Sequence, residues 1–376
     1  MIDSETMVGT GLRITVAKDE LASKLTTVAR GVSTRTAVLV LGGIQLRAEA
    51  GRLHLAATDM EVSLRGAIDA QVTDEGTVVV PGRLLLDIAR SLPDNDVSIE
   101  HRPEEAVVVV SSGTAMYRLH TYSAEDFPRL PDVDTLPLHA VDREALVETI
   151  SRVGRSASRD ESRPVLTGIL VRFEPGKVVM AATDSYRLAV KETPVDGTLP
   201  DLEAIIPARA LQELARIAGG SDELQLGLLE NHVVFGADGT WLTTRRIDGQ
   251  FPNYRQLLPE QFEHELMLPR EELLEVVRRV SLMAQRNSPL RLRFAGGELT
   301  VSAVTQDVGE ARESLPAPYA ADPLEIGFNA DFLRDGLESV DADTIKFKLI
   351  SPLRPAVLEG DTPDYVYLIM PIRLAG

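Results

Sequence analysis

Cysteine is absent from the 376 residues of this sequence, which excludes disulfides, thiolate metal sites, iron–sulfur clusters and cysteine nucleophiles. Long hydrophobic runs are lacking too, because no stretch approaches the roughly 18 to 20 apolar residues that a membrane span needs. Residues 1–6 are acidic and polar and lack the pattern of a secretory signal. The six histidines show no metal-ligand spacing. We therefore expect a cytoplasmic protein with no membrane contact and no metal or other cofactor.

Positive charge is also in short supply. There are 39 Lys and Arg against 57 Asp and Glu, which gives a formal net charge of −18. At face value this balance argues against nucleic acid as a partner, since binding to DNA needs cations placed against phosphates. An acidic protein can still carry a basic surface, so the position of the cations decides the matter. The length predicts two or three domains.

A helical pattern recurs three times along the chain. An apolar stripe with helical spacing starts at Val16 and runs through Leu21, Leu25, Val28 and Val32. It returns from Val141 through Ile150 to Ala157, and again from Leu268 to Val280. We expect helices over 18–33, 142–159 and 269–286.

Three further features follow each of these helices in the same order. The first is a hairpin with glycine at its turn, at Gly51, Gly176 and Gly296–Gly297. The second is a strand that begins with threonine, at residues 57–61 and 182–186 and, more loosely, at 304–307. The third is a helix over 81–92, 207–220 and 329–340, started by Pro at its first position or by an Asn cap. Strand-like runs follow, such as 106–110 and 232–235.

Proline-rich connectors close the first two copies. They are Phe127-Pro128-Arg129-Leu130-Pro131 and Phe251-Pro252-Asn253-Tyr254, continuing to Pro259. Paired prolines stiffen a path and suit a linker. We predict an α+β fold of three tandem domains, each with two helices backed by β-sheets, at residues 1–134 (with a short tail, 1–11), 135–260 and 261–376.

Arginines recur in register on the predicted helices. Arg83 and Arg90 lie two turns apart, as do Arg209 and Arg216, and the groups Arg152/Arg155/Arg159 and Arg278/Arg279/Arg286 form similar stripes. A ring of six helices packed side by side would enclose a hole of roughly 9 Å, and a ring of twelve would enclose a hole of roughly 28 Å. Only the second admits duplex DNA, so a head-to-tail dimer is the assembly of the right size.

From Ile14 to Leu374 the sequence resembles the bacterial β sliding clamps, the processivity subunits of the replicative polymerase. The most specific pieces are residues 57–59, 183–188, 251–254 and the end, Met370-Pro371-Ile372-Arg373-Leu374. The resemblance implies three clamp domains, a dimeric ring around duplex DNA, and no catalytic activity of its own. It also implies partners: the polymerase α subunit, the clamp loader, and other polymerases and repair proteins that bind through short linear motifs.

The resemblance also implies two sets of site residues. The motif-binding pocket is expected to be lined by Arg163, Leu166, Thr183, Ser185, Tyr186, Arg187, Leu188, Pro252, Gln256, Leu257, Asn329, Phe332, Leu353, Pro355, Leu368, Ile369, Met370, Pro371, Ile372 and Arg373. Contacts to DNA phosphates are expected from Lys24, Arg35, Arg83, Arg90, Arg152, Arg155, Arg209, Arg216 and Arg279. Ser185 stands where the family often has Gly, Gln256 where Arg is common, and Phe332 where Tyr is frequent.

Two other functions fit parts of the sequence. Asp59 and Asp184 follow a threonine at equivalent places, and carboxylate pairs serve hydrolases and two-metal sites. They lie in different repeats and look like turn residues, and no phosphate loop, His-x-x-x-His motif or nucleophile elbow is present. A repeat scaffold that does not bind DNA is the second alternative.

Overall fold

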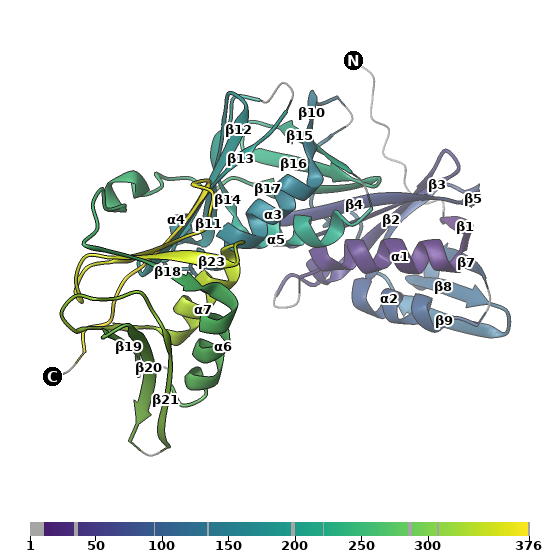
Figure 1. Cartoon of the computed structure of the whole chain (residues 1–376). Coiled ribbons are helices and arrows are strands. Elements are labelled where there is room, and N and C mark those ends of the chain that lie inside the picture. Colours follow the sequence, from purple (N-terminus) through teal and green to yellow (C-terminus); the bar gives the residue numbers. More distant parts are fainter. Residues whose placement is uncertain are drawn as a thin grey trace. The chain divides into compact units, whose positions relative to one another are not determined.

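The computed structural model describes residues 11–33, 37–93, 95–133, 135–196, 200–220, 222–284, 288–306 and 308–374 (Figure 1). The chain divides into two compact units, Met1–Arg143 with Glu213–Arg246, and Glu144–Gln212 with Ile247–Gly376. The division cuts the middle repeat, because each of its two sheets continues into a neighbouring repeat. The boundaries of the three domains therefore stay a prediction.

The first unit contains two sheets with two helices packed between them. A five-stranded sheet has the order β5 (Gln71–Asp74), β1 (Arg13–Ala17), β7 (Asp96–Arg102), β8 (Val107–Ser112) and β9 (Ala115–His120). An eight-stranded sheet has the order β10 (Leu138–Asp142), β15 (Glu223–Leu228), β16 (His232–Ala237), β17 (Thr240–Arg245), β4 (Val62–Asp69), β3 (Arg52–Thr58), β2 (Gly43–Glu49) and β6 (Gly76–Pro81). Helices α1 (Lys18–Val28) and α2 (Gly82–Ser91) share the first repeat's core with both sheets.

The second unit repeats this plan. Its eight-stranded sheet has the order β14 (Glu203–Pro207), β11 (Gly168–Glu174), β12 (Lys177–Thr183), β13 (Arg187–Pro194), β25 (Tyr365–Ile369), β24 (Ala356–Glu359), β23 (Thr344–Leu349) and β18 (His264–Pro269). A four-stranded sheet has the order β21 (Gly309–Pro316), β20 (Glu298–Thr305), β19 (Leu290–Ala295) and β22 (Leu324–Phe328). Helices α4 (Pro164–Thr167), α6 (Arg270–Ser281) and α7 (Ala330–Ser339) belong to this unit, whereas α3 (Arg143–Val153) and α5 (Ala208–Ile217) cross the division.

The first helix of each repeat ends earlier than its apolar stripe predicts. After α1 and α3 the chain continues as short 3-10 helices, Ala29–Gly31 and Gly154–Ser156, and α6 ends at Ser281. Gly154 favours such an end because glycine weakens a helix interior. Further 3-10 helices cover Leu39–Gly42, Pro103–Glu105 and Tyr254–Leu257.

The starts of the second helices are partly as predicted. The side chain of Asn329 accepts a hydrogen bond from the N–H of Phe332 and caps α7, as expected. The expectation that proline occupies the first helical position was wrong for α2 and α5, since Pro81 and Pro207 are the residues before these helices.

The threonine-containing segments are turns rather than strand starts. Thr58 ends β3 and Thr183 ends β12, and the residues after them form the turn into the next strand. The side chain of Asp59 accepts the N–H of Glu61 and Val62, and that of Asp184 accepts the N–H of Tyr186 and Arg187. The aspartates are thus turn-forming residues, which removes the argument for a carboxylate pair in catalysis.

The two long sheets form because strands of adjacent repeats pair edge to edge. In the first unit β4 pairs with β17, with Ser63 opposite Thr243. In the second unit β13 pairs with β25, with Leu188 opposite Leu368. The residues of the second pair lie 125 positions after those of the first in both strands, so the two pairings have the same register. We call β4–β17 the first junction and β13–β25 the second junction. No helix in the described part of the chain is long and apolar enough to cross a membrane.

Candidate functional site

The turn between β12 and β13 forms one wall of a cavity in the second unit. The hydroxyl of Thr183 accepts the N–H of Ser185 at 3.1 Å, and Asp184 Oδ1 accepts the next two N–H groups at 2.9 and 3.0 Å. Ser185 has a φ of 79°, a left-handed conformation that favours glycine. Met60 has a φ of 78° at the equivalent place in the first repeat. These hydrogen bonds hold the turn in a fixed shape.

Arg187 ties this turn to α7. Its guanidinium is buried and contacts Asp184 at 3.1 Å and Asp335 at 2.5 Å. It also lies 4.3 Å from the ring centre of Phe332, which stacks against Tyr186. Burial by itself would lower the pKa of Arg187, but the interactions with Tyr367, Asp335 and Asp184 outweigh it and raise that pKa. Arg187 therefore stays charged and joins elements of the second and third repeats.

The cavity beside this turn has a volume of about 630 Å³. Four segments line it: the β12–β13 turn, the second connector, the loop before β24, and the end of β25. The lining residues are Thr183, Ser185, Arg187, Leu188, Gln256, Leu257, Leu258, Pro259, Glu260, Leu353, Arg354, Pro355, Leu368 and Met370. A cavity of this size accommodates a few side chains of an extended peptide.

Large apolar side chains stand exposed at the rim. Leu353 is 65% exposed and Leu257 is 50% exposed, and Met370 is exposed as well. Beneath them, Leu188 and Leu368 are buried in the sheet. An exposed apolar group around a concave surface indicates a site for a protein partner. The site fits a short peptide that supplies two or three apolar side chains.

The structure brings ten of the predicted pocket residues to this cavity: Thr183, Ser185, Arg187, Leu188, Gln256, Leu257, Leu353, Pro355, Leu368 and Met370. Arg163 lies next to them, since its guanidinium donates to the Ser185 hydroxyl at 3.2 Å. Tyr186 and Phe332 form the stacked pair beside Arg187. Leu166, Pro252, Pro371, Ile372 and Arg373 do not contribute to the cavity lining.

Two of the predicted pocket residues have other roles. Ile369 is fully buried in β25, and Asn329 caps α7, so we assign both to the core and the helix start rather than to the pocket. Sequence reasoning missed Leu258, Pro259, Glu260 and Arg354, which line the cavity. The signal was present, because Leu258 and Pro259 end the second connector. That connector is not a free linker: Tyr254 is buried in it and packs against the sheet.

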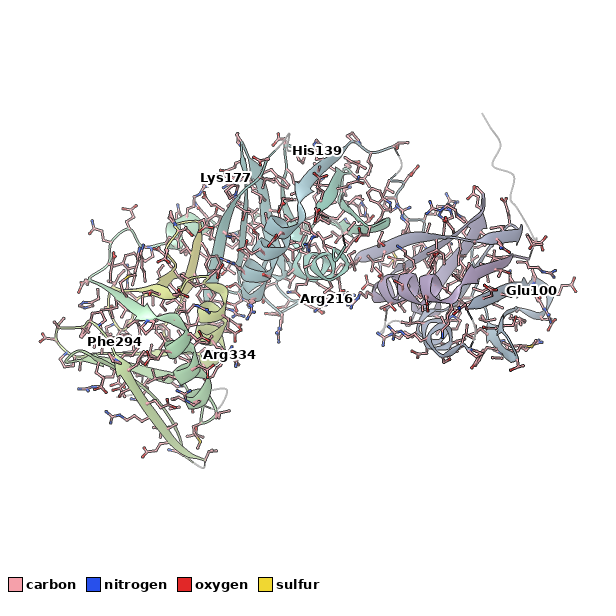
Figure 2. All side chains as sticks on the ribbon, turned by 45° about the vertical axis from the view of Figure 1, so that its right-hand side comes forward. Glu100, His139, Lys177, Arg216, Phe294 and Arg334 are labelled. Atoms are coloured by element: carbon pink, nitrogen blue, oxygen red, sulfur yellow. The ribbon has the colours of Figure 1, made fainter. Side chains whose placement is uncertain are left out.

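The predicted DNA contacts fall into two groups by their surroundings. Arg83, Arg90, Arg209 and Arg216 are exposed on α2 and α5, and Figure 2 labels Arg216. Arg90 donates to the Thr26 hydroxyl at 3.0 Å, and Arg216 pairs with Glu213. Arg35 lies outside the described residues, and so does Arg286 of the predicted stripe on the third helix.

Three further predicted cations form ion pairs with carboxylates, as Arg216 does. Arg152 contacts Asp341 at 2.8 Å, Arg155 contacts Glu338 at 2.5 Å, and Arg279 contacts Glu313 at 2.8 Å. Burial would raise the pKa of Glu338, but hydrogen bonds from Arg278 and Arg155 lower it, so this carboxylate is a charged partner of both arginines. Arg159 was expected on a helix and lies beyond the end of α3.

Lys24 is partly buried. Its ammonium donates to the Thr240 hydroxyl at 3.1 Å, and burial lowers its pKa.

Among the described residues, no three His, Asp or Glu side chains are grouped so that they could hold a metal ion.

Comparison with known proteins places the chain in a family. Three consecutive family models match it: the N-terminal, central and C-terminal domains of the DNA polymerase III beta subunit, over residues 12–131, 140–253 and 255–373. The beta sliding clamp of Streptomyces coelicolor is 36% identical over 97% of this chain and 100% of its own length. That of Synechococcus elongatus is 35% identical over 96% and 100%.

Solved structures agree with this. The DNA polymerase III subunit beta of Pseudomonas aeruginosa is 30% identical, with a TM-score of 0.88 over 96% of this chain and 100% of that one. A sliding clamp from the same organism, bound to griselimycin, is 29% identical, with a TM-score of 0.87 over 97% and 100%. The chain belongs to the DNA polymerase III beta subunit family, the beta sliding clamps, and its fold is three tandem clamp domains.

Proposed function

We propose that two copies of this chain join head to tail into a closed ring that encircles duplex DNA and slides along it. The ring tethers the polymerase α subunit, the clamp loader, and other polymerases and repair proteins, which bind the apolar cavity in turn. The chain itself performs no catalysis and acts in the cytoplasm. Membership in the sliding clamp family supports this function. The observation that supports the ring is that two strands, β9 and β21, lie unpaired at the edges of their sheets.

Each chain contains two complete junctions between repeats. It also contains one strand for each side of a third junction. β4–β17 and β13–β25 are the complete junctions. The equivalent of β4 and β13 in the third repeat is β21, and the equivalent of β17 and β25 in the first repeat is β9. Both are edge strands of their sheets. Unpaired edges invite strand addition, so β21 of one copy and β9 of another complete the series.

The two existing junctions predict the register of the third. Ser63 faces Thr243, and Leu188 faces Leu368. Ala182 and Ala303 are both fully buried on their strands, so the residues that follow them, Thr183 and Val304, take equivalent places. Leu188 is paired with Thr183 and Glu310 with Val304, so Glu310 takes the place of Leu188. The partner of Leu188 is Leu368, and the residue two repeats, or 250 positions, before Leu368 is Arg118 on β9. We therefore place Glu310 opposite Arg118 of the second copy, an oppositely charged pair that favours this register.

Exposed apolar side chains accompany the two free edges. Met116 on β9 is 66% exposed, and Leu282, just after α6, is 83% exposed. At the existing junctions, Arg30 pairs with Glu213 at 3.2 Å and Arg155 approaches Asp335 at 3.8 Å. Leu282 occupies the equivalent place in the third repeat, twelve residues after the helix start. An exposed leucine at this place, where the other repeats have arginine, suits the apolar core of an interface between chains.

Closure after two chains also sets the size of the hole. Two chains contribute twelve long helices, and side-by-side packing at about 10 Å gives a hole of roughly 28 Å. The exposed arginines Arg83, Arg90, Arg209 and Arg216 are the main candidates for phosphate contacts, with Arg152, Arg155, Arg279, Lys24 and Arg35 as further candidates. Such contacts carry no sequence information, and the acidic remainder of the chain disfavours tight binding. Topology rather than affinity then holds the ring on DNA.

Retention on circular DNA tests this function. The clamp is loaded onto a nicked plasmid by a clamp loader and passed over a gel-filtration column in high salt. We expect it to elute with the circular plasmid and to be lost after a single restriction cut, because a ring runs off a free end. Equal retention on circular and linear DNA would show binding by affinity and contradict the proposal.

A further inference from the structure

The first junction carries a second cavity, which the proposed clamp function does not use. It lies on the face of the eight-stranded sheet opposite α1 and has a volume of about 770 Å³. The first connector forms one wall, with Phe127 to Leu130 and Val133. The remaining lining comes chiefly from β2, β3, β4 and β17. Its polar residues are Gln45, Arg47, Arg52, His54, Arg65, Glu125 and Arg129, together with Trp241.

The repeat shows what the same positions do at the second junction. Gln45, Ala56, Arg65 and Trp241 face one another across four strands. Adding 125 to each number gives Leu170, Ala181, Val190 and Val366, which face one another across the second junction in the same way. There the row is an apolar core, covered by Tyr254 and Leu258 of the second connector. At the first junction Gln45, Arg65 and Trp241 stand in place of these apolar residues, Ala56 is buried against Phe127, and the row lines the cavity.

The cavity at the first junction differs in charge from the chain as a whole. Four arginines and a histidine line it, against a single carboxylate, Glu125, in a chain with a net charge of −18. Arg47 has an exposed surface partner, Glu49, at 3.4 Å, and Arg52 has Asp69 at 3.6 Å. Exposed pairs of this kind are weak, so these arginines are available to a better acceptor. Arg65 donates to the carbonyl oxygen of Pro131, which fixes the connector as a wall.

An apolar floor lies beneath these cations. Trp241 is half-buried, and its ring covers Gly236, where a Cβ would come within 2.5 Å of it. Phe127 packs on Ala56 and Val79 at the other end. The cavity volume of about 770 Å³ between the connector and the sheet accommodates a few side chains of a peptide.

We propose that this cavity is a second partner site, which binds an acidic, extended peptide segment of another protein. Its glutamate or aspartate side chains pair with Arg47, Arg52 and Arg129, and its apolar side chains rest on Trp241 and Phe127. The arginines provide charge-assisted hydrogen bonds to carboxylates. The two junctions thus select different peptides: an apolar motif at the second and an acidic one at the first.

Trp241 is the only tryptophan in the chain, so intrinsic fluorescence reports directly on this cavity. The full-length clamp is titrated with a blocked eight-residue peptide of alternating glutamate and leucine, and with the same peptide carrying glutamine in place of glutamate. We expect a saturable change in tryptophan emission with the acidic peptide. Its affinity falls as salt is raised, and the glutamine peptide binds at least about tenfold more weakly.

Variants separate this site from general charge attraction. Arg47→Gln with Arg129→Gln should weaken the acidic peptide about tenfold or more, whereas Arg13→Gln should leave its affinity unchanged. Arg13 is the matched control, because its side chain is as exposed as that of Arg47, at 54% each, and also has acidic surface partners. The proposal is overturned if the acidic peptide leaves the emission unchanged or if both peptides bind equally. It is also overturned if a twelve-nucleotide oligothymidylate binds more tightly than the acidic peptide, which would make the cavity a nucleic-acid site.

Discussion

Arg312→Pro should convert the dimer into a monomer while each chain stays folded. At the second junction the N–H of Glu192 donates to Asp364 and that of Met370 donates to Tyr186, so even-numbered residues of β13 bond across the junction. The third repeat follows the same pattern, which directs the N–H of Arg312 away from β20 and toward the second copy. Proline removes this donor, and its ring obstructs the incoming strand.

The expected loss is about 2 to 3 kcal/mol at each interface. The ring contains two interfaces, so the dimer dissociation constant should rise by a factor of roughly a thousand or more. Sedimentation equilibrium measures it. Arg312→Ala keeps the N–H and is the matched control, which should remain a dimer. An unchanged far-ultraviolet circular dichroism spectrum verifies folding, since edge strands tolerate proline. A dimeric Arg312→Pro variant would place the interface elsewhere.

Leu353→Asp should abolish binding of partners to the apolar cavity. Leu353 is largely exposed in the free chain, so aspartate there leaves the fold intact. In the complex it places a carboxylate where an apolar group is needed, at a cost of about 3 kcal/mol. The affinity for the purified polymerase α subunit should fall more than about 100-fold, as measured by biolayer interferometry.

Met267→Asp is the matched control for this prediction. Met267 is an exposed methionine on β18 of the same unit, outside the cavity lining. It should bind the polymerase subunit as the unchanged chain does, and both variants should remain dimers. Full affinity in Leu353→Asp, or equal losses in both variants, would remove the cavity as the partner site.

Local features of the fold could be predicted from the sequence because their causes are local. Gly51 and Gly176 have φ values of 77° and 76°, as the glycine turns required, and Asn329 caps α7. The order of helix, hairpin and second helix follows from periodicity in each copy. The helix ends could not be placed, because the chain continues past Val28 and Val153 into 3-10 turns that also bury residues, Ala29 and Gly31 in the first and Gly154 and Ser156 in the second.

The pairing of β4 with β17 and of β13 with β25 could not be predicted, because strand partners far apart in sequence are chosen by packing. The same limit applies to the site. The resemblance indicated the cavity's walls but also included Ile369, since burial inside a strand is not visible in an apolar run. The connectors were interpreted as stiff linkers. Only the structure shows that Tyr254 packs into the core at one junction, whereas at the other the connector and the sheet leave a cavity beside Trp241.

A covalent closure of the ring tests the central claim most directly. The chain has no cysteine, so Arg118→Cys with Glu310→Cys introduces the only two thiols. A directly opposed, hydrogen-bonded pair has Cα atoms about 5.5 Å apart, which suits a disulfide. The variant is loaded onto a nicked plasmid, oxidised, and treated with sodium dodecyl sulfate. We predict that the clamp stays linked to circular DNA through the detergent and is released by linearisation or by dithiothreitol. Release by detergent alone, or failure of the disulfide to form between chains, would contradict a ring closed through β21 and β9.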